Sequence, residues 1–195
     1  MLSVDKNPRG AFHNRLYAVA VHGTSVVLFW SADEGRTWKG PNIVRDAPPA
    51  SPDQESNKIV FNPCIAVNRD GVVAVTWGEG TRLKKSGFIR SWTYRITASW
   101  DGGQTFSESL AVSSEDHQAI RFSGQALIGS TRRNGPDRQL GSVSIDAFAD
   151  SGGHTFGLTA AADGVFHAAW TDNRTGVPQV WTAAVHAKRT GTPSR

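Results

Sequence analysis

The sequence predicts an all-β protein, a β-propeller built from four-stranded antiparallel blades. Two eight-residue stretches, residues 31–38 and 99–106, carry the same residue types at the same offsets, and each lies between two apolar runs typical of strands. Residues 70–79 also align with residues 163–172, roughly two blade lengths further on. The 20 glycines, nine prolines and seven tryptophans suit many turns and aromatic packing between sheets. Repeats of this length leave apolar faces that only stacked neighbours bury, which favours a propeller.

The repeated eight-residue stretch is predicted to be a hairpin turn. Its serine, aspartate and threonine side chains form hydrogen bonds with nearby backbone groups, and its glycine adopts the positive φ of a tight turn. The final aromatic residue directs the chain back toward a core. The repeated positions are Ser31, Asp33, Gly35, Thr37 and Trp38 in the first stretch, and Ser99, Asp101, Gly103, Thr105 and Phe106 in the second.

This S-x-D-x-G-x-T-[WF] pattern is the Asp box, and on it the chain resembles the sialidase-like (BNR repeat) β-propellers. The resemblance covers nearly the whole chain and corresponds to the C-terminal blades of such a propeller. It implies that the boxes are structural turns, outside the site. It also implies a glycan-directed protein, part of an exo-sialidase-type glycoside hydrolase that acts on terminal acidic sugars. Such enzymes use a Tyr nucleophile and arginines that bind the substrate carboxylate.

Three regions are expected along the chain. Residues 1–15 are polar and are predicted to be irregular and loosely held; residues 16–186 hold the blades; residues 187–195 form a tail. The proline-rich stretch 46–58 is expected to be a loop between the first two blades, and the second blade is interrupted by a long loop at 78–91. A poorly repeated blade is expected over residues 117–148.

Counting these units gives about four blades. The first lacks a clear innermost strand and the last lacks an outermost one. The ring is therefore either incomplete or shortened. A third, degenerate copy of the repeated turn at residues 149–156 is interpreted as a strand entry or a fused box.

The two repeated turns also predict where a site would lie. In an antiparallel blade the turns between strands one and two and between strands three and four share one end, so all other connections gather at the opposite end. Binding residues concentrate on such loops. Exposure to solvent alone also explains the many charged residues of these loops. A binding site and a merely solvated surface therefore both stay open as interpretations. The loops expected at this end are residues 46–58, 78–91, 113–121 and 172–178.

Arg174 is the most suggestive single residue for binding an acidic sugar. It follows Trp170 and Asp172 in a segment that resembles a Trp-x-Asp-x-Arg motif of late sialidase-like blades. An Asp–Arg pair that only shapes the loop explains the segment equally well. Arg121 and Arg82 are the further substrate-binding candidates.

The catalytic candidates are Tyr94, Glu79 and Asp172. Tyr94 lies at a strand start, where it faces a central cavity or packs between blades. The resemblance also implies an Arg-Ile-Pro motif before the first box and a catalytic-acid Asp in the loop after it, but the motif is absent and no obvious Asp for that acid role stands in the loop. The enzyme class therefore stays open. The alternatives are a non-catalytic Asp-box propeller that binds carbohydrate or protein, and a structural unit that self-associates through open blade edges.

Composition and motifs also argue against several other functional classes. The net charge of +4 comes from scattered basic residues, which argues against nucleic-acid binding. No apolar run is long enough to span a bilayer, and no metal-ligand set or phosphate-binding glycine loop is present, so neither a metal nor a cofactor is expected. Cys64 is the single cysteine and is predicted to be a core thiol. No signal peptide is visible, and the resemblance favours a secreted or cell-surface protein if the N-terminus is truncated.

Overall fold

The computed structural model describes residues 1–46, 56–85, 89–113, 117–118, 156–172 and 179–189. Every regular element in these residues is a β-strand, which confirms the all-β prediction. The strands are β1 (Leu2–Val4), β2 (Leu16–His22), β3 (Ser25–Ser31), β4 (Lys39–Arg45), β5 (Ser56–Val67), β6 (Val73–Leu83), β7 (Ile89–Ser99), β8 (Leu110–Ala111), β9 (His117–Gln118), β10 (Gly157–Ala160), β11 (Phe166–Asp172) and β12 (Gln179–Val185).

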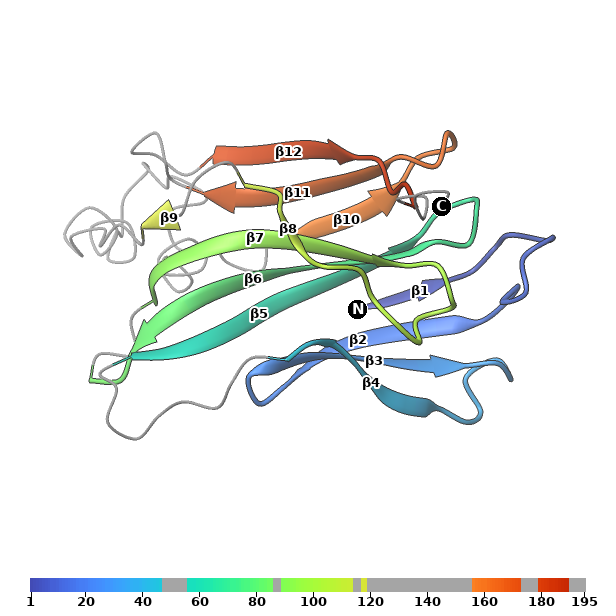
Figure 1. The fold of residues 1–195 in the computed structure, drawn as a ribbon, viewed down its shortest axis with the longest axis horizontal. Coiled ribbons are helices and arrows are strands. Elements are labelled where there is room, and N and C mark those ends of the chain that lie inside the picture. Colours follow the sequence, from blue (N-terminus) through green and yellow to red (C-terminus); the bar gives the residue numbers. More distant parts are fainter. Residues whose placement is uncertain (47–55, 86–88, 114–116, 119–155, 173–178, 190–195) are drawn as a thin grey trace, which may run out of the picture.

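The strands form three antiparallel sheets. Sheet A has the order β1-β2-β3-β4, sheet B has the order β5-β6-β7-β8 with β9 also paired to β7, and sheet C has the order β10-β11-β12. Sheet B lies between the other two (Figure 1). In each sheet the strands follow one another in chain order, as in an up-and-down blade.

Sheet B packs face to face against both of its neighbours. Toward sheet A it buries Val73, Val75 and Trp77 against Tyr17 and Leu28. Toward sheet C its residues Cys64, Trp92 and Tyr94 pack with Phe156, Ala168 and Trp170. Cys64 is 2% exposed, and burial raises the pKa of its thiol, so the prediction of a core thiol is confirmed.

The N-terminal segment is more ordered than the sequence predicted. Leu2–Val4 pairs with β2, and the Met1 ammonium donates a hydrogen bond to the Val19 carbonyl at 3.2 Å. The segment also contributes Asp5, which is fully buried. The innermost strand that the first blade was expected to lack is therefore β1. It was missed because three residues carry too little periodicity to stand out.

The long loop predicted at residues 78–91 is also wrong. β6 and β7 stay paired from Val73↔Ser99 to Arg82↔Ile89, so most of the expected loop continues the hairpin. Glycine and charged residues in this stretch mimic a loop in the sequence, but one of the glycines is required by packing. A Cβ on Gly78 would lie 2.4 Å from the Phe61 ring. Likewise β5 begins at Ser56, inside the predicted loop 46–58.

Two further expectations concern segments that lie mostly outside the described residues. Sheets B and C share a core and are direct neighbours. The poorly repeated blade expected between them falls mostly on residues 119–155, outside the described residues, as does the degenerate turn at 149–155. In the predicted tail, Ala187 packs against the cluster between sheets B and C.

The two repeated turns have the same hydrogen bonds. In the first, Gly35 N–H donates to Ser31 Oγ at 2.9 Å and Thr37 N–H donates to Asp33 Oδ1 at 2.9 Å. In the second, Gly103 N–H and Thr105 N–H make the same bonds to Ser99 and Asp101. Hydrogen bonds from Thr37 and Ser31 lower the pKa of Asp33 to about 2. The polar side chains of both turns therefore serve local structure, as expected, whereas the expectation of an aromatic residue directed toward a core is wrong for Trp38, which is 41% exposed.

Candidate functional site

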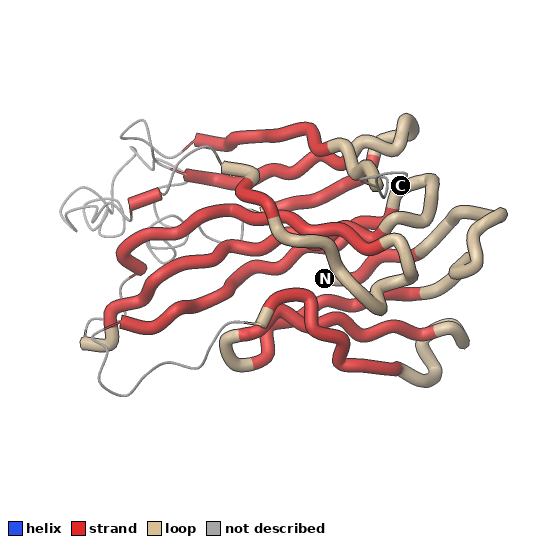
Figure 2. Tube along the Cα trace, in the orientation of Figure 1, coloured by secondary structure: helices blue, strands red, loops and turns tan. Residues whose placement is uncertain are grey.

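The strand directions separate the molecule into two ends. The hairpin at residues 68–72, the turn at 161–165 and both repeated turns lie at one end, here called the turn end (Figure 2). At the opposite end, here called the loop end, β4 finishes and β5 begins, β6 finishes and β7 begins, and β11 finishes with Asp172 paired to Gln179. The loop end is therefore the place for a site on loops.

Arg82 is the one predicted substrate-binding arginine within the described residues. It lies near the end of β6 with an exposed side chain, opposite Asn57 in register. Arg121 and Arg174 lie outside the described residues. For Asp172 the structure describes the backbone, as the last residue of β11.

Three further cations lie at the loop end of sheet B, although Lys58, which pairs with Thr81, lies on the opposite face of the sheet from Arg82, which pairs with Asn57. Lys58, Lys84 and Lys85 are also exposed, and Lys58 Nζ donates a hydrogen bond to Thr81 Oγ1 at 3.4 Å. The described residues within 56–59 and 80–85 include no carboxylate. These described residues therefore give the end of sheet B a positive charge, which favours anionic ligands.

Tyr94 is a core residue between sheets B and C, the packing position that the sequence left open. Its side chain is fully buried, its ring centroid lies 5.0 Å from that of Phe156 and 5.4 Å from that of Trp170, and its hydroxyl lies 2.7 Å from Thr76 Oγ1. Burial raises the pKa of Tyr94 well above its usual value. A phenol in this position has neither the access nor the acidity that a nucleophile needs.

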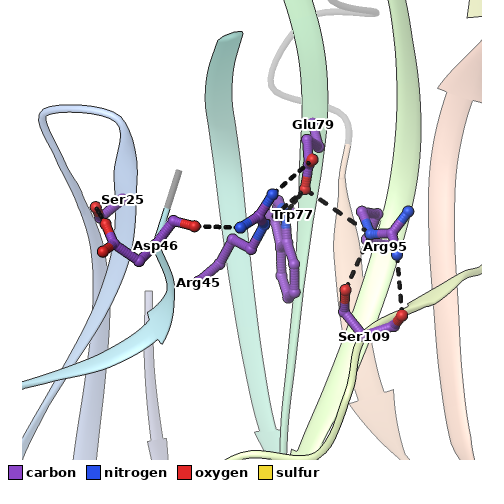
Figure 3. A network of polar contacts seen from close by, with 7 residues as sticks. All are labelled: Ser25, Arg45, Asp46, Trp77, Glu79, Arg95 and Ser109. Atoms are coloured by element: carbon purple, nitrogen blue, oxygen red, sulfur yellow. Dashed lines mark hydrogen bonds and ion pairs between the residues drawn. The ribbon is translucent and has the colours of Figure 1, made fainter. Parts of the chain in front are cut away.

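Glu79 lies between two arginines that come from different strands (Figure 3). Arg45 of β4 donates to Glu79 Oε2 from Nε at 3.0 Å and to Oε1 from Nη2 at 3.1 Å. Arg95 of β7 lies with Nε 3.8 Å from Glu79 Oε2, and Trp77 Nε1 donates to the same oxygen at 3.4 Å. We call Arg45, Trp77, Glu79 and Arg95 the inter-sheet network.

The network extends to both sides of Glu79. Arg95 donates to Ser109 Oγ at 3.1 Å and to the Ser109 carbonyl at 2.9 Å. Arg45 also donates to the Asp46 carbonyl, and Ser25 Oγ donates to Asp46 Oδ1 at 2.8 Å. Because Arg45 belongs to sheet A and Glu79 to sheet B, the network joins two sheets.

The network holds Glu79 in its ionised form. Burial by itself would raise the pKa of this carboxyl, but the hydrogen bond from Arg45, its positive charge, the Trp77 donor and the charge of Arg95 together lower the pKa below the usual value. A general acid needs a raised pKa. The geometry therefore fits a structural ion pair better than a catalytic acid.

The sequence identified Glu79 but missed Arg45 and Arg95. Arg95 is opposite Trp77 in register, and Glu79 follows Trp77 by two positions, so all three share the face toward sheet A. That alternation was the available signal, and it was hidden by the prediction of a loop from residue 78. Arg45 comes from another sheet, and no local pattern could have paired it with Glu79.

Removing the charge of Glu79 is expected to weaken the fold in a pH-dependent way. The pKa of Glu79 in the folded protein is below the ordinary pKa of a glutamate. The ionised carboxylate therefore stabilises the fold fully at pH values above the ordinary pKa, and this stabilisation is lost as the pH falls through the folded-state pKa. We expect Glu79→Gln to lower the free energy of unfolding by about 1–2 kcal/mol near neutral pH, and by much less at about pH 3. Urea unfolding at both pH values measures the difference.

The matched control for this experiment is Glu34→Gln. Glu34 pairs with Arg36 at 3.6 Å, but the side chains are 84% and 78% exposed, so little change is expected. An equal loss for Glu79→Gln at both pH values would show that its charge does not stabilise the fold.

The described residues contain no group of three or more His, Cys, Asp or Glu side chains placed to hold a metal ion. Among the same residues, no helix is long and apolar enough to cross a membrane.

Neither the known protein families nor the curated protein sequences give a match. Solved structures do. The Hadza microbial sialidase Hz136 is 12% identical with a TM-score of 0.53, and the match covers 93% of this chain and 33% of that one. A Dyadobacter fermentans protein of unknown function is 15% identical with a TM-score of 0.48, covering 91% and 36%. A variant of the NanB sialidase from Streptococcus pneumoniae is 15% identical with a TM-score of 0.46, covering 89% and 20%.

These comparisons concern the fold. Three stacked antiparallel sheets and the similarity to Hz136 define a sialidase-like, propeller-like fold. The chain spans about a third of the length of Hz136 and of the Dyadobacter protein, and a fifth of the length of NanB. Fold alone does not specify activity.

Proposed function

We propose that this chain is a glycan-binding part of a sialidase-like propeller and that its loop end binds a terminal sugar that carries a carboxylate. The observation that supports this proposal is that the loop end of sheet B has four exposed cations, Lys58, Arg82, Lys84 and Lys85, with Lys58 and Arg82 on opposite faces of the sheet. The similarity to a protein named as a sialidase supplies the substrate class. Guanidinium groups bind carboxylates with two parallel hydrogen bonds, which suits the arginines for this role.

In this proposal Arg82 and Arg174 bind the carboxylate, and Arg121 is a further contact. The lysines raise the local concentration of anionic glycans through their charge. Glu79 and Tyr94 stabilise the fold and take no part in binding. The turn end, with its repeated turns, carries no ligand.

We expect Arg82→Ala and Arg174→Ala each to weaken binding of 3′-sialyllactose about tenfold, which corresponds to the loss of one charge-assisted contact. Calorimetric titration measures the affinity, and lactose serves as the neutral ligand. Arg36→Ala is the matched control, because Arg36 is an exposed arginine at the turn end. Equal affinity for the two sugars, or an equal effect of all three variants, would reject the proposal in favour of simple solvation of these charges.

The second candidate function is hydrolysis, as part of an exo-sialidase-type glycoside hydrolase. The similarity to Hz136 over 93% of the chain favours it. The positions of Tyr94 and Glu79 weigh against it, because Asp172 is then the only predicted catalytic candidate left. A fluorogenic sialoside distinguishes the two: turnover that survives purification supports the hydrolase, and binding without turnover supports the glycan-binding function.

A further inference from the structure

Three buried polar atoms of sheet A and its N-terminal segment have no hydrogen-bond partner within the described residues. They are Asp5 Oδ2, Arg15 Nε and Tyr17 Oη. The side chains of Asp5 and Tyr17 are fully buried. Burying a polar atom without a partner lowers stability, and such atoms are uncommon in folded proteins. Three of them in one place therefore need a physical explanation.

The pairing of β1 with β2 brings these three side chains together. Ser3 is opposite Tyr17 in register, and the Asp5 N–H donates to the Arg15 carbonyl at 3.0 Å, which continues the pairing by two residues. Residues opposite each other, and residues two positions apart on one strand, share a face of the sheet. This face packs against sheet B. Burial raises the pKa of Tyr17 to about 12, and the charges of Arg15 and Asp5 also act on this pKa, which agrees with their proximity.

Arg15 is fixed by contacts with other residues. Its guanidinium carbon lies 3.9 Å from the centroid of the Trp30 ring and 4.3 Å from that of the Phe12 ring, so the group stacks on both aromatic side chains. Its Nη1 donates to the Gly102 carbonyl at 3.2 Å. These contacts hold the guanidinium in place while Arg15 Nε and Asp5 Oδ2 both stay without a partner. Something other than a direct ion pair must therefore satisfy the two atoms.

We propose that Asp5 Oδ2, Arg15 Nε and Tyr17 Oη together bind one buried water molecule. A water molecule donates to a carboxylate and accepts from a guanidinium, and a phenol hydroxyl can do either, so one water satisfies all three atoms. Buried waters typically make about three hydrogen bonds to otherwise unpaired groups. A cation would be repelled by Arg15 and an anion by Asp5, so the two opposite charges select a neutral, dipolar molecule.

The backbone of sheet B also limits the size of what can bind. A Cβ on Gly71 would lie 3.1 Å from Asp5 Oδ2, and a Cβ on Gly102 would lie 2.8 Å from Arg15 Nη1. Both distances are shorter than an ordinary van der Waals contact. The turns that contain these glycines therefore lie directly against two of the three side chains, where a ligand larger than water has no space.

The proposed water links the N-terminal segment to the rest of the fold. The site lies at the turn end, where the connection from β1 to β2 meets the hairpin between β5 and β6 (Figure 1). Through the water, Asp5 is joined to β2, and Arg15 is itself bonded to the second repeated turn. The water is thus part of the structure that orders a segment expected to be loosely held. It is independent of the proposed glycan site at the loop end.

Tyr17→Phe tests the proposal because the sign of its effect depends on the water. If the hydroxyl is bonded to a water, the variant loses a hydrogen bond, and we expect the urea midpoint to fall by about 0.5 M. If the hydroxyl has no partner, its removal leaves the midpoint unchanged or raises it. Tyr94→Phe is the matched control, because the buried Tyr94 hydroxyl lies 2.7 Å from Thr76 Oγ1 and its removal must lower the midpoint.

A crystal structure of the unmodified chain, at a resolution that shows ordered water, separates a bound water from direct contact. We expect one water within about 2.7–3.2 Å of each of the three atoms. A midpoint for Tyr17→Phe equal to or above that of the unmodified chain would overturn the proposal. A crystal structure without water among the three atoms would overturn it as well, whether or not Asp5 then bonds directly to Tyr17 or Arg15.

Discussion

Replacing Gly103 with alanine is expected to destabilise the fold by about 2–5 kcal/mol, more than the same change at Gly35 in the first repeated turn. Gly103 has a φ of 82°, so an alanine there is strained by about 1–2 kcal/mol. Its Cβ would also lie 2.8 Å from Leu28 Cδ2 in the core between sheets A and B. Overpacking of this kind adds about 1–3 kcal/mol.

Gly35 is the matched control for this prediction. It occupies the same position in the first repeated turn with a φ of 86°, but a Cβ there would lie 3.6 Å from its nearest neighbour, Leu16. Gly35→Ala is therefore expected to cost only the backbone strain. Urea unfolding of both variants measures the difference, which isolates the contact between the second turn and sheet A. Equal losses would show that the second turn does not pack tightly against that sheet.

The second repeated turn is more than a local hairpin, because it also contacts residues of sheet A. Asn42 Nδ2 donates to the Gly103 carbonyl at 2.7 Å, and an Arg15 Nη1 hydrogen donates to the Gly102 carbonyl at 3.2 Å. Asn42 lies in β4 and Arg15 directly precedes β2, so both donors belong to the part of the chain that forms sheet A. The turn itself joins β7 to β8 of sheet B. The turn therefore holds neighbouring sheets together at the turn end, opposite the inter-sheet network around Glu79.

The sequence predicted the features whose causes are local. The repeated turns were predictable because the hydrogen bonds of their serine, aspartate and threonine side chains join residues within a few positions of one another. The strands around Leu28 and Val75 were predictable from runs of β-branched and apolar residues. Cys64 was predictable as a core residue because its neighbours are apolar.

The features that the sequence missed depend on distant residues. β1 is a strand because β2 pairs with it, and its three residues give no signal alone. Gly78 suggests a loop in sequence, but its lack of a side chain makes room for Phe61 across the strand pair. Glu79 was predicted as a catalytic candidate on a loop, and its partner Arg45 comes from a different sheet. For the candidate site, the sequence thus predicted the loop end, while the partners of individual side chains required the structure.

Substitution of Tyr94 is expected to lower stability and to leave any turnover of a sialoside unchanged. Tyr94→Ala removes a fully buried ring that packs against Phe156 and Trp170, and should lower the free energy of unfolding by about 3–5 kcal/mol. Tyr94→Phe keeps the ring and loses the hydrogen bonds of the hydroxyl, to Thr76 Oγ1 at 2.7 Å and to the Gly157 carbonyl at 3.4 Å, at a cost of about 1 kcal/mol. Thermal and urea unfolding of the two variants measure these losses.

The hydroxyl of Tyr94 can be assigned to structure or to chemistry by one further comparison. If its role is the hydrogen bond to Thr76, the double variant Tyr94→Phe, Thr76→Val will be less destabilised than the sum of the single variants, because both single changes remove the same hydrogen bond. Sialoside binding, and any turnover, should be the same for Tyr94→Phe as for the unmodified chain. A nucleophile gives the opposite result: turnover falls by orders of magnitude in Tyr94→Phe while the stabilities of the two hydroxyl variants simply add. Because burial holds the phenol protonated and away from solvent, we expect the first result.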